Sequence, residues 1–167
     1  MQSYNLSKLN IVILENNKLI RRLMSNVFQE FGVRKGMSTG NPDDAYDLFT
    51  NNHADIIISD WSPELDGIEF MQRLRSTSES PDPFVPVNIC TGNTEKQHVY
   101  TARDAGMTEF LVKPVSARTI YGRIVSVIEK HRPFIRNDNF FGPDRRRRNI
   151  PDFGVERRSK TAVRTFQ

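Results

Sequence analysis

Short apolar runs alternate with longer segments of helical periodicity along the first 130 residues. The runs are rich in Ile and Val and cover residues 10–14, 55–59, 85–90 and 109–112. A run that is apolar at nearly every position is typical of a strand in a parallel sheet, where helices cover both faces. We therefore predict that these four runs are strands of such a sheet.

Helical periodicity is clearest in two segments, one after the first run and one after the last. Apolar residues recur at spacings of three and four over residues 20–31, and Gly32 follows as a C-terminal cap. The same spacing recurs over residues 117–128, where Ser116 is placed to cap the N-terminus. Weaker patterns predict helices over residues 43–52, 67–75 and 94–105 and a short strand over residues 33–38.

The predicted elements form an alternation of strand and helix that is repeated five times. Crossovers between parallel strands are right-handed, so helices are expected on both faces of the sheet. We therefore predict an α/β domain with a doubly wound parallel sheet, (βα)5. In such folds the ligand site lies beyond the carboxyl ends of the strands.

Polar residues stand where four of the predicted strands end. Glu15 and Asn16 follow the first strand, Asp60 the third, Thr91 the fourth and Lys113 the fifth. A carboxylate can accept a group, and an acid beside an amide offers oxygen ligands to a hard cation. A hydroxyl and an ammonium can bind a transferred anion. Together these residue types predict a phosphoryl-acceptor site.

The motifs at these strand ends resemble those of bacterial response regulator receiver domains, over roughly residues 8 to 130. They read LENN, SDWSPELDG, CTGN and FLVKP. The resemblance implies a flavodoxin-like sheet with strand order 2-1-3-4-5. It also implies a phosphoacceptor signalling protein, rather than a conventional enzyme, that receives a phosphoryl group from a sensor histidine kinase or a phosphotransfer protein with Mg²⁺ bound nearby.

The resemblance assigns a role to each matching residue. Asp60 is the nucleophile, Lys113 is the counter-charge of the phosphoryl oxygens, and Thr91 is the hydroxyl that follows those oxygens. Phe110 takes the position of the switch aromatic, which in the family swings inward on activation. Pro114 takes the position of a proline that is typically cis.

Two departures from the family pattern concern the metal site, whose implied ligands are Glu15, Asn16, Asp60 and the backbone carbonyl of Ser62. The family usually has two carboxylates at the acidic pair, whereas this chain has Glu15 and a neutral amide. Losing one charge beside a divalent cation near the surface costs on the order of one to a few kcal/mol, so we expect weaker Mg²⁺ binding. Pro63 also comes one residue earlier than is usual, which shortens the loop over residues 61–67.

The chain is about one domain long. The balance of basic and acidic residues changes near residue 131. Residues 1–130 hold 14 Lys and Arg against 16 Asp and Glu, whereas residues 131–167 hold 10 against 4. The second region has few aliphatic residues and so has little apolar surface to bury. We predict a receiver domain over residues 1–130 and a basic, largely irregular tail over residues 131–167.

The tail contains a tandem repeat, because residues 141–152 and 153–164 share Phe-Gly, an acid and Arg-Arg at matching offsets. Two copies are too few for a solenoid. Either the tail is a solvated basic segment, or it docks on an acidic partner, on nucleic acid or on the receiver's own site. Phe134 and Ile135 follow the last predicted helix and are expected to pack on the receiver. The chain beyond about residue 137 is expected to be mobile.

Other signals narrow the class of protein. Cys90 has no partner for a disulfide, and no apolar stretch is long enough to span a membrane, so a cytoplasmic location is expected. No helix-turn-helix or zinc-binding spacing follows residue 130, so nucleic acid is not the expected partner and output should pass through protein contacts.

Two functions remain open at this point. One is a phosphorylatable signalling switch, and the other is a pseudo-receiver scaffold that binds partners without phosphorylation because Asn16 and the short loop have altered the metal site. A nucleic-acid adaptor rests on the basic tail alone. The resemblance places partner contacts and a homodimer on the face formed by residues 94–105, residues 109–112 and the last helix.

Overall fold

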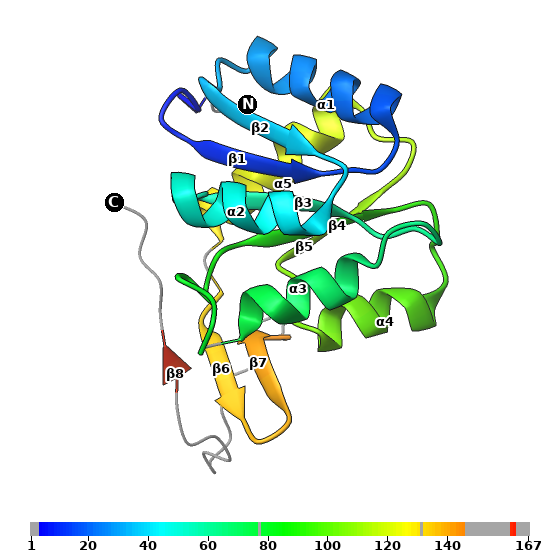
Figure 1. Ribbon diagram of the computed structural model, residues 1–167. Coiled ribbons are helices and arrows are strands. Elements are labelled where there is room, and N and C mark those ends of the chain that lie inside the picture. The colour runs from blue at the N-terminus through cyan, green and yellow to red at the C-terminus, as the bar shows by residue number, and fades with distance from the viewer. Residues whose placement is uncertain (1–3, 77, 131, 146–160, 163–167) are drawn as a thin grey trace.

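The central sheet has five parallel strands in the order β2-β1-β3-β4-β5 (Figure 1). The structure is a computed structural model that describes residues 4–76, 78–130, 132–145 and 161–162. The strands are β1 (Asn10–Leu14), β2 (Lys35–Thr39), β3 (Ile56–Asp60), β4 (Val87–Thr91) and β5 (Glu109–Val112). This order confirms the predicted doubly wound α/β fold.

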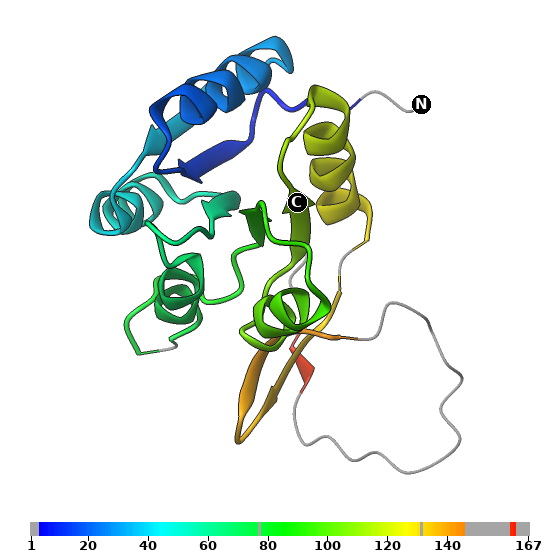
Figure 2. The same cartoon turned by 90° about the vertical axis from the view of Figure 1, so that its right-hand side faces the viewer.

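In the described part of the chain, four helices connect the five strands and a fifth follows β5, and together they cover both faces of the sheet, as Figures 1 and 2 show. They are α1 (Lys18–Glu30), α2 (Pro42–Asn52), α3 (Gly67–Arg75), α4 (Lys96–Asp104) and α5 (Ala117–Glu129). Ser116 caps α5 as predicted, in a capping box with Thr119, and Gly32 follows α1 with φ of 80°. No helix within the described residues is long and apolar enough to cross a membrane.

Alternate side chains of the central strands enter two separate cores. Val12, Leu14 and Ile57 pack toward α2, α3 and α4, whereas Ile11 and Ile13 pack toward α1 and α5. Full burial of each such side chain contributes about 1.5–3 kcal/mol. Burial on both faces explains why these strands are apolar at consecutive positions.

Cys90 lies in the core beneath α1 and α5 and is a free thiol. Burial raises its pKa to about 12, with Glu15 and Asp60 adding to the rise and Lys113 opposing it. The side chain therefore behaves as a small apolar core residue at neutral pH.

A β-hairpin follows α5 in the segment expected to be irregular. Strands β6 (Phe134–Asn137) and β7 (Phe140–Pro143) are antiparallel, and β8 (Thr161–Ala162) pairs with the other edge of β6. Phe134 and Ile135 are buried, each 5% exposed, as expected, but β7 lies where mobility was expected. The rest of the second repeat, apart from β8, lies outside the described residues.

The hairpin packs at the amino ends of β4 and β5, away from the predicted site. The ring centroid of Phe134 lies 5.2 Å from that of Phe84 and 5.6 Å from that of Phe141. Gly142 lies against Gly106 so closely that a Cβ on Gly142 would be 2.7 Å from the Gly106 Cα. A larger residue at position 142 would therefore push β7 away from the receiver.

Polar contacts fasten the same hairpin to the start of β5 and the end of α4. Arg132 donates to the carbonyl oxygens of Thr108 and Asp144, and Arg145 lies 3.2 Å from an Asp104 carboxylate oxygen. The first copy of the tail repeat thus contacts its own receiver at the end of the sheet opposite the predicted site.

Candidate functional site

The ends of β1, β3 and β5 bring two carboxylates and one ammonium into contact. Lys113 Nζ lies 2.7 Å from Glu15 Oε2 and 2.6 Å from Asp60 Oδ1. Each acid has 2% of its side chain exposed, and Lys113 has 18%. Parallel strands end at the same edge of the sheet, which explains why residues almost a hundred positions apart in sequence meet here.

The cluster holds more acidic than basic groups. Burial alone would lower the pKa of Lys113, but the hydrogen bonds and charges of Asp60 and Glu15 outweigh it and raise that pKa. The ammonium therefore stays charged at neutral pH. Two carboxylates against one ammonium leave an excess of one negative charge, which a bound cation would offset.

The loop after Asp60 is short and tightly folded. Ser62 Oγ donates to Asp60 Oδ2 at 2.8 Å, and the backbones of Ser62 and Leu65 exchange two hydrogen bonds of 3.1 Å. Asp66 caps α3 through its side chain. Gly67 then lies against the Asp60 carbonyl oxygen so closely that a Cβ would collide with it. The shortened loop therefore fits because glycine begins α3.

Thr91 is buried at the end of β4 but bonds away from Asp60. Its Oγ1 accepts the Asn93 N–H at 3.2 Å and lies 3.3 Å from His98 Nε2. The His98 ring stacks on Trp61, with centroids 3.4 Å apart and planes 11° apart. His98 is not among the residues that the sequence predicts for this site. The sequence signal that could have indicated His98 is its position in the first turn of the helix that follows the β4 strand end.

The remaining predicted residues surround this cluster. Asn16 is exposed beside Glu15, and Asn17 caps α1 by accepting the N–H groups of Leu19 and Ile20. Phe110 is half-buried against the core on the side of α2, α3 and α4. The peptide bond between Lys113 and Pro114 is cis, as the resemblance implied.

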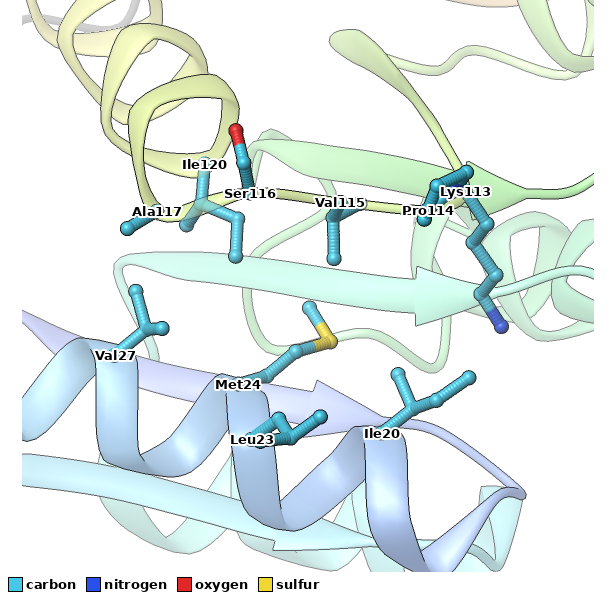
Figure 3. Close-up of a pocket in the computed structure, with 10 residues that line it drawn as sticks. All are labelled: Ile20, Leu23, Met24, Val27, Lys113, Pro114, Val115, Ser116, Ala117 and Ile120. Carbon is cyan, nitrogen blue, oxygen red and sulfur yellow. The ribbon is translucent and has the colours of Figure 1, made fainter.

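Two hollows meet at Lys113. The first is bordered by Asp60, Trp61, Thr91, His98 and Lys113, among others. The second, of about 160 Å³, lies between α1 and the segment that leads into α5. In Figure 3 its apolar walls face each other; they come from Ile20, Leu23, Met24, Val27, Val115, Ala117 and Ile120.

Comparisons with known proteins agree with this geometry. The chain is 25% identical over 120 residues to the chemotaxis protein CheY homolog of Campylobacter jejuni. The aligned residues cover 71% of this chain and 91% of the relative. The crystallised chemotaxis protein CheY4 of Vibrio cholerae has a TM-score of 0.65 at 24% identity, over 71% of this chain and 98% of that one. A DNA-binding response regulator of the LuxR family from Staphylococcus aureus has a TM-score of 0.62 at 20% identity, with the same coverage.

The two solved structures share the fold of this chain, and the family is established by sequence. Residues 11–125 match the response regulator receiver domain, a span of more than half of the chain. That span contains β1 apart from Asn10, all of β2 to β5, and every residue of the cluster around Asp60. The chain therefore belongs to the family of response regulator receiver domains of two-component signalling systems.

Proposed function

We propose that this receiver accepts a phosphoryl group on Asp60 from a histidine of a sensor kinase or a phosphotransfer protein, and signals through protein contacts. The observation that carries the proposal is the buried Asp60 carboxylate at the carboxyl edge of the sheet. One of its oxygens is bound by Lys113 and the other by Ser62. Membership of the receiver family supplies the reaction class.

The proposed chemistry is a phosphoryl transfer between two protein side chains. An Asp60 carboxylate oxygen forms a new bond to phosphorus while the bond from phosphorus to the donor histidine nitrogen breaks. The electron pair of that bond returns to the imidazole. Lys113 offers a positive charge to the transferred oxygens, and Thr91 borders the same hollow, where its hydroxyl can donate to them.

The residues beside Asp60 fit Mg²⁺, the metal that the family implies. Glu15 Oε2 is buried and has no partner other than the Lys113 ammonium within the described part of the chain. Ser62 O accepts one N–H and keeps a second lone pair. Mg²⁺ binds through one or two carboxylates and keeps several waters, so this donor set suffices. When bound, Mg²⁺ would supply positive charge to the phosphoryl oxygens.

These metal ligands nevertheless include only two negatively charged side chains, Glu15 and Asp60. Among the described residues, no group of three or more His, Cys, Asp and Glu side chains is arranged to hold a metal ion. The exposed Asn16 stands where a second acid of the pair would stand. This observation favours the second candidate function, a pseudo-receiver scaffold that binds partners without phosphorylation.

Restoring the missing charge is expected to tighten metal binding. Asn16→Asp should lower the Kd for Mg²⁺ about tenfold, because a charged oxygen ligand beside a divalent cation contributes on the order of one to a few kcal/mol. Trp61 is the single tryptophan and follows Asp60 directly, so its fluorescence reports the titration. Asn26→Asp, an exposed change on α1, is the matched control and should leave the Kd unchanged. Equal affinities for Asn16→Asp and the wild type would place Asn16 outside the metal site.

The two candidate functions differ in one direct experiment. The wild-type protein is incubated with acetyl phosphate over a range of Mg²⁺ concentrations, and phosphoprotein is separated on a phosphate-affinity gel. The proposal expects a single Mg²⁺-dependent acyl phosphate that hydroxylamine removes. Absence of this adduct at every Mg²⁺ concentration would favour the scaffold.

We also propose that the phosphodonor protein contacts the apolar hollow between α1 and α5 shown in Figure 3. Leu19 and Leu23 on α1 are 67% and 55% exposed, which is unusual for large apolar side chains next to one another. Lys113 borders this hollow and also binds Asp60. A partner seated here would therefore lie next to the acceptor.

A charge placed in this hollow is expected to slow phosphotransfer from a protein donor but not from a small-molecule donor. Leu23→Glu should slow transfer from a phosphorylated histidine phosphotransfer domain by about tenfold, the effect of losing a modest interface anchor. The rate with acetyl phosphate should not change. Gln29→Glu adds the same charge to an exposed position of α1 and is the matched control. Equal slowing by both variants would mean that charge alone, and not this hollow, determines the rate.

The output surface is proposed to be the face formed by α4, β5 and α5. Tyr100 on α4 and Val112 on β5 are 46% and 43% exposed, so this face offers apolar area to a downstream protein or to a second copy of the chain. Phe110 lies on β5 between this face and the core. Phosphorylation is therefore proposed to change partner binding and to favour a homodimer here.

A further inference from the structure

A stacked pair of aromatic rings joins the loop after Asp60 to the first turn of α4. Trp61 belongs to that loop and His98 to α4, and their rings are nearly parallel with centroids 3.4 Å apart. Both residues border the hollow that contains Asp60. Within the described residues, the side chain of Glu95, the N-cap residue of α4, makes no capping hydrogen bond. The stack thus links the start of α4 to the loop that follows Asp60.

The stack also orients the hydroxyl of Thr91. Thr91 Oγ1 already accepts the Asn93 N–H, so its own proton can be donated to His98 Nε2, which lies 3.3 Å away. Burial lowers the pKa of His98 despite the opposing charge of Glu95, which keeps the ring neutral and able to accept this proton. In this arrangement the Thr91 proton is used by His98 and is not directed at Asp60.

We propose that the Trp61–His98 stack holds the Thr91 hydroxyl in a resting position in the unphosphorylated protein, and that Thr91 must leave His98 before it can bind a phosphoryl group on Asp60. His98 is then a positioning residue, since it acts through Thr91 and does not touch the acceptor. Release of His98 would also free the first turn of α4, which lies on the proposed output face. This inference rests on the proposed phosphorylation of Asp60.

Two substitutions separate the hydrogen bond of His98 from its stacking. His98→Phe keeps a ring against Trp61 but removes the nitrogen, whereas His98→Gln places an amide at about the reach of Nε2 but removes the ring. Binding of beryllofluoride with Mg²⁺, which mimics the phosphoryl group on a carboxylate, is measured by calorimetry. We expect His98→Phe to bind about fivefold more tightly than the wild type, the factor that corresponds to one net hydrogen bond lost from the resting state. His98→Gln keeps an acceptor for Thr91 but loses the stack that positions it, so its affinity should lie between those of the wild type and His98→Phe; an affinity equal to that of the wild type would show that the stack does not hold Thr91.

A third substitution, at Thr91, tests whether the effect of His98 passes through the Thr91 hydroxyl. Thr91→Val removes the hydroxyl, and in that background His98→Phe should no longer change the affinity. Gln97→Ala, an exposed change in the same helical turn, is the control and should bind as the wild type does. Unchanged affinity in His98→Phe, or the same gain in the Thr91→Val background, would overturn the proposal.

The resting contact has a test that does not need phosphorylation. Nitrogen chemical shifts of the His98 ring, read by NMR in the unmodified protein, should change when Thr91 becomes Val. Unchanged shifts would show that Thr91 does not bond to His98. Failure of the wild type to bind beryllofluoride would instead contradict the proposed function and the release step with it, while these shifts would still decide the resting contact.

Discussion

Asp60→Asn is expected to abolish phosphorylation of this receiver by acetyl phosphate and by a phosphohistidine donor alike. The amide has nearly the shape of the carboxylate but carries no charge and is a poor nucleophile toward phosphorus. Lys113 keeps its contact with Glu15 in the variant, so the fold should be retained. Phosphate-affinity gels and intact-mass spectrometry measure the loss directly.

A matched change elsewhere makes this result specific. Asp47→Asn removes the same charge from an exposed position of α2 and should leave the yield of phosphoprotein unchanged. Persistent phosphorylation of Asp60→Asn would mean that another side chain is the acceptor. Circular dichroism on both variants separates loss of chemistry from loss of structure.

The sheet could be predicted from the apolar pattern of its strands, and the charged cluster from the fact that those strands are parallel. β1, β3 and β4 are covered on both faces, so their sequences are apolar at nearly every position. Parallel strands place their carboxyl ends together, and so the meeting of Asp60 with Lys113 followed from topology. β2 lies at the edge of the sheet and is largely exposed, which explains why its predicted range differs by one or two residues at each end.

The Thr91–His98 contact could not be predicted in the same way. It depends on how the first turn of α4 is rotated and on the ring of Trp61, and neither is encoded in a periodic pattern. Metal-ligand spacing, which identifies many functional histidines in a sequence, does not detect a ring stacked on an aromatic neighbour. The exposure of Asn16 likewise follows from the path of the chain into the cap at Asn17.

The hairpin was missed for a different reason. Average composition over residues 131–167 is basic and poor in aliphatics, and this average hides a short segment of high apolar content. Asp138 and Asn139 form the two-residue turn between Asn137 and Phe140. Each flanking strand carries an apolar pair, and a two-residue turn of Asp, Asn or Gly between such strands indicates a hairpin. The partner surface around Phe84 and Gly106 is formed by residues distant in sequence.

Phe134→Ala is expected to lower the free energy of unfolding by about 3 kcal/mol, the usual cost of removing a buried phenylalanine side chain. Phe134 is 5% exposed and contacts the rings of Phe84 and Phe141, and its face lies 5.1 Å from the Arg75 guanidinium carbon. Truncation to alanine would remove three aromatic or cation contacts at once. Urea denaturation, followed by circular dichroism, measures the change.

This loss should leave the chemistry intact, because the hairpin packs at the amino ends of β4 and β5 and Asp60 lies at the carboxyl end of β3. Tyr100→Ala truncates a half-exposed aromatic side chain and should change stability by no more than about 0.5 kcal/mol. A Phe134→Ala protein as stable as this control would show that the hairpin adds little to the receiver and that residues beyond α5 fold independently of it. A protein that loses both stability and phosphorylation would instead show that the hairpin affects the site through β4 and β5, over the full length of those strands.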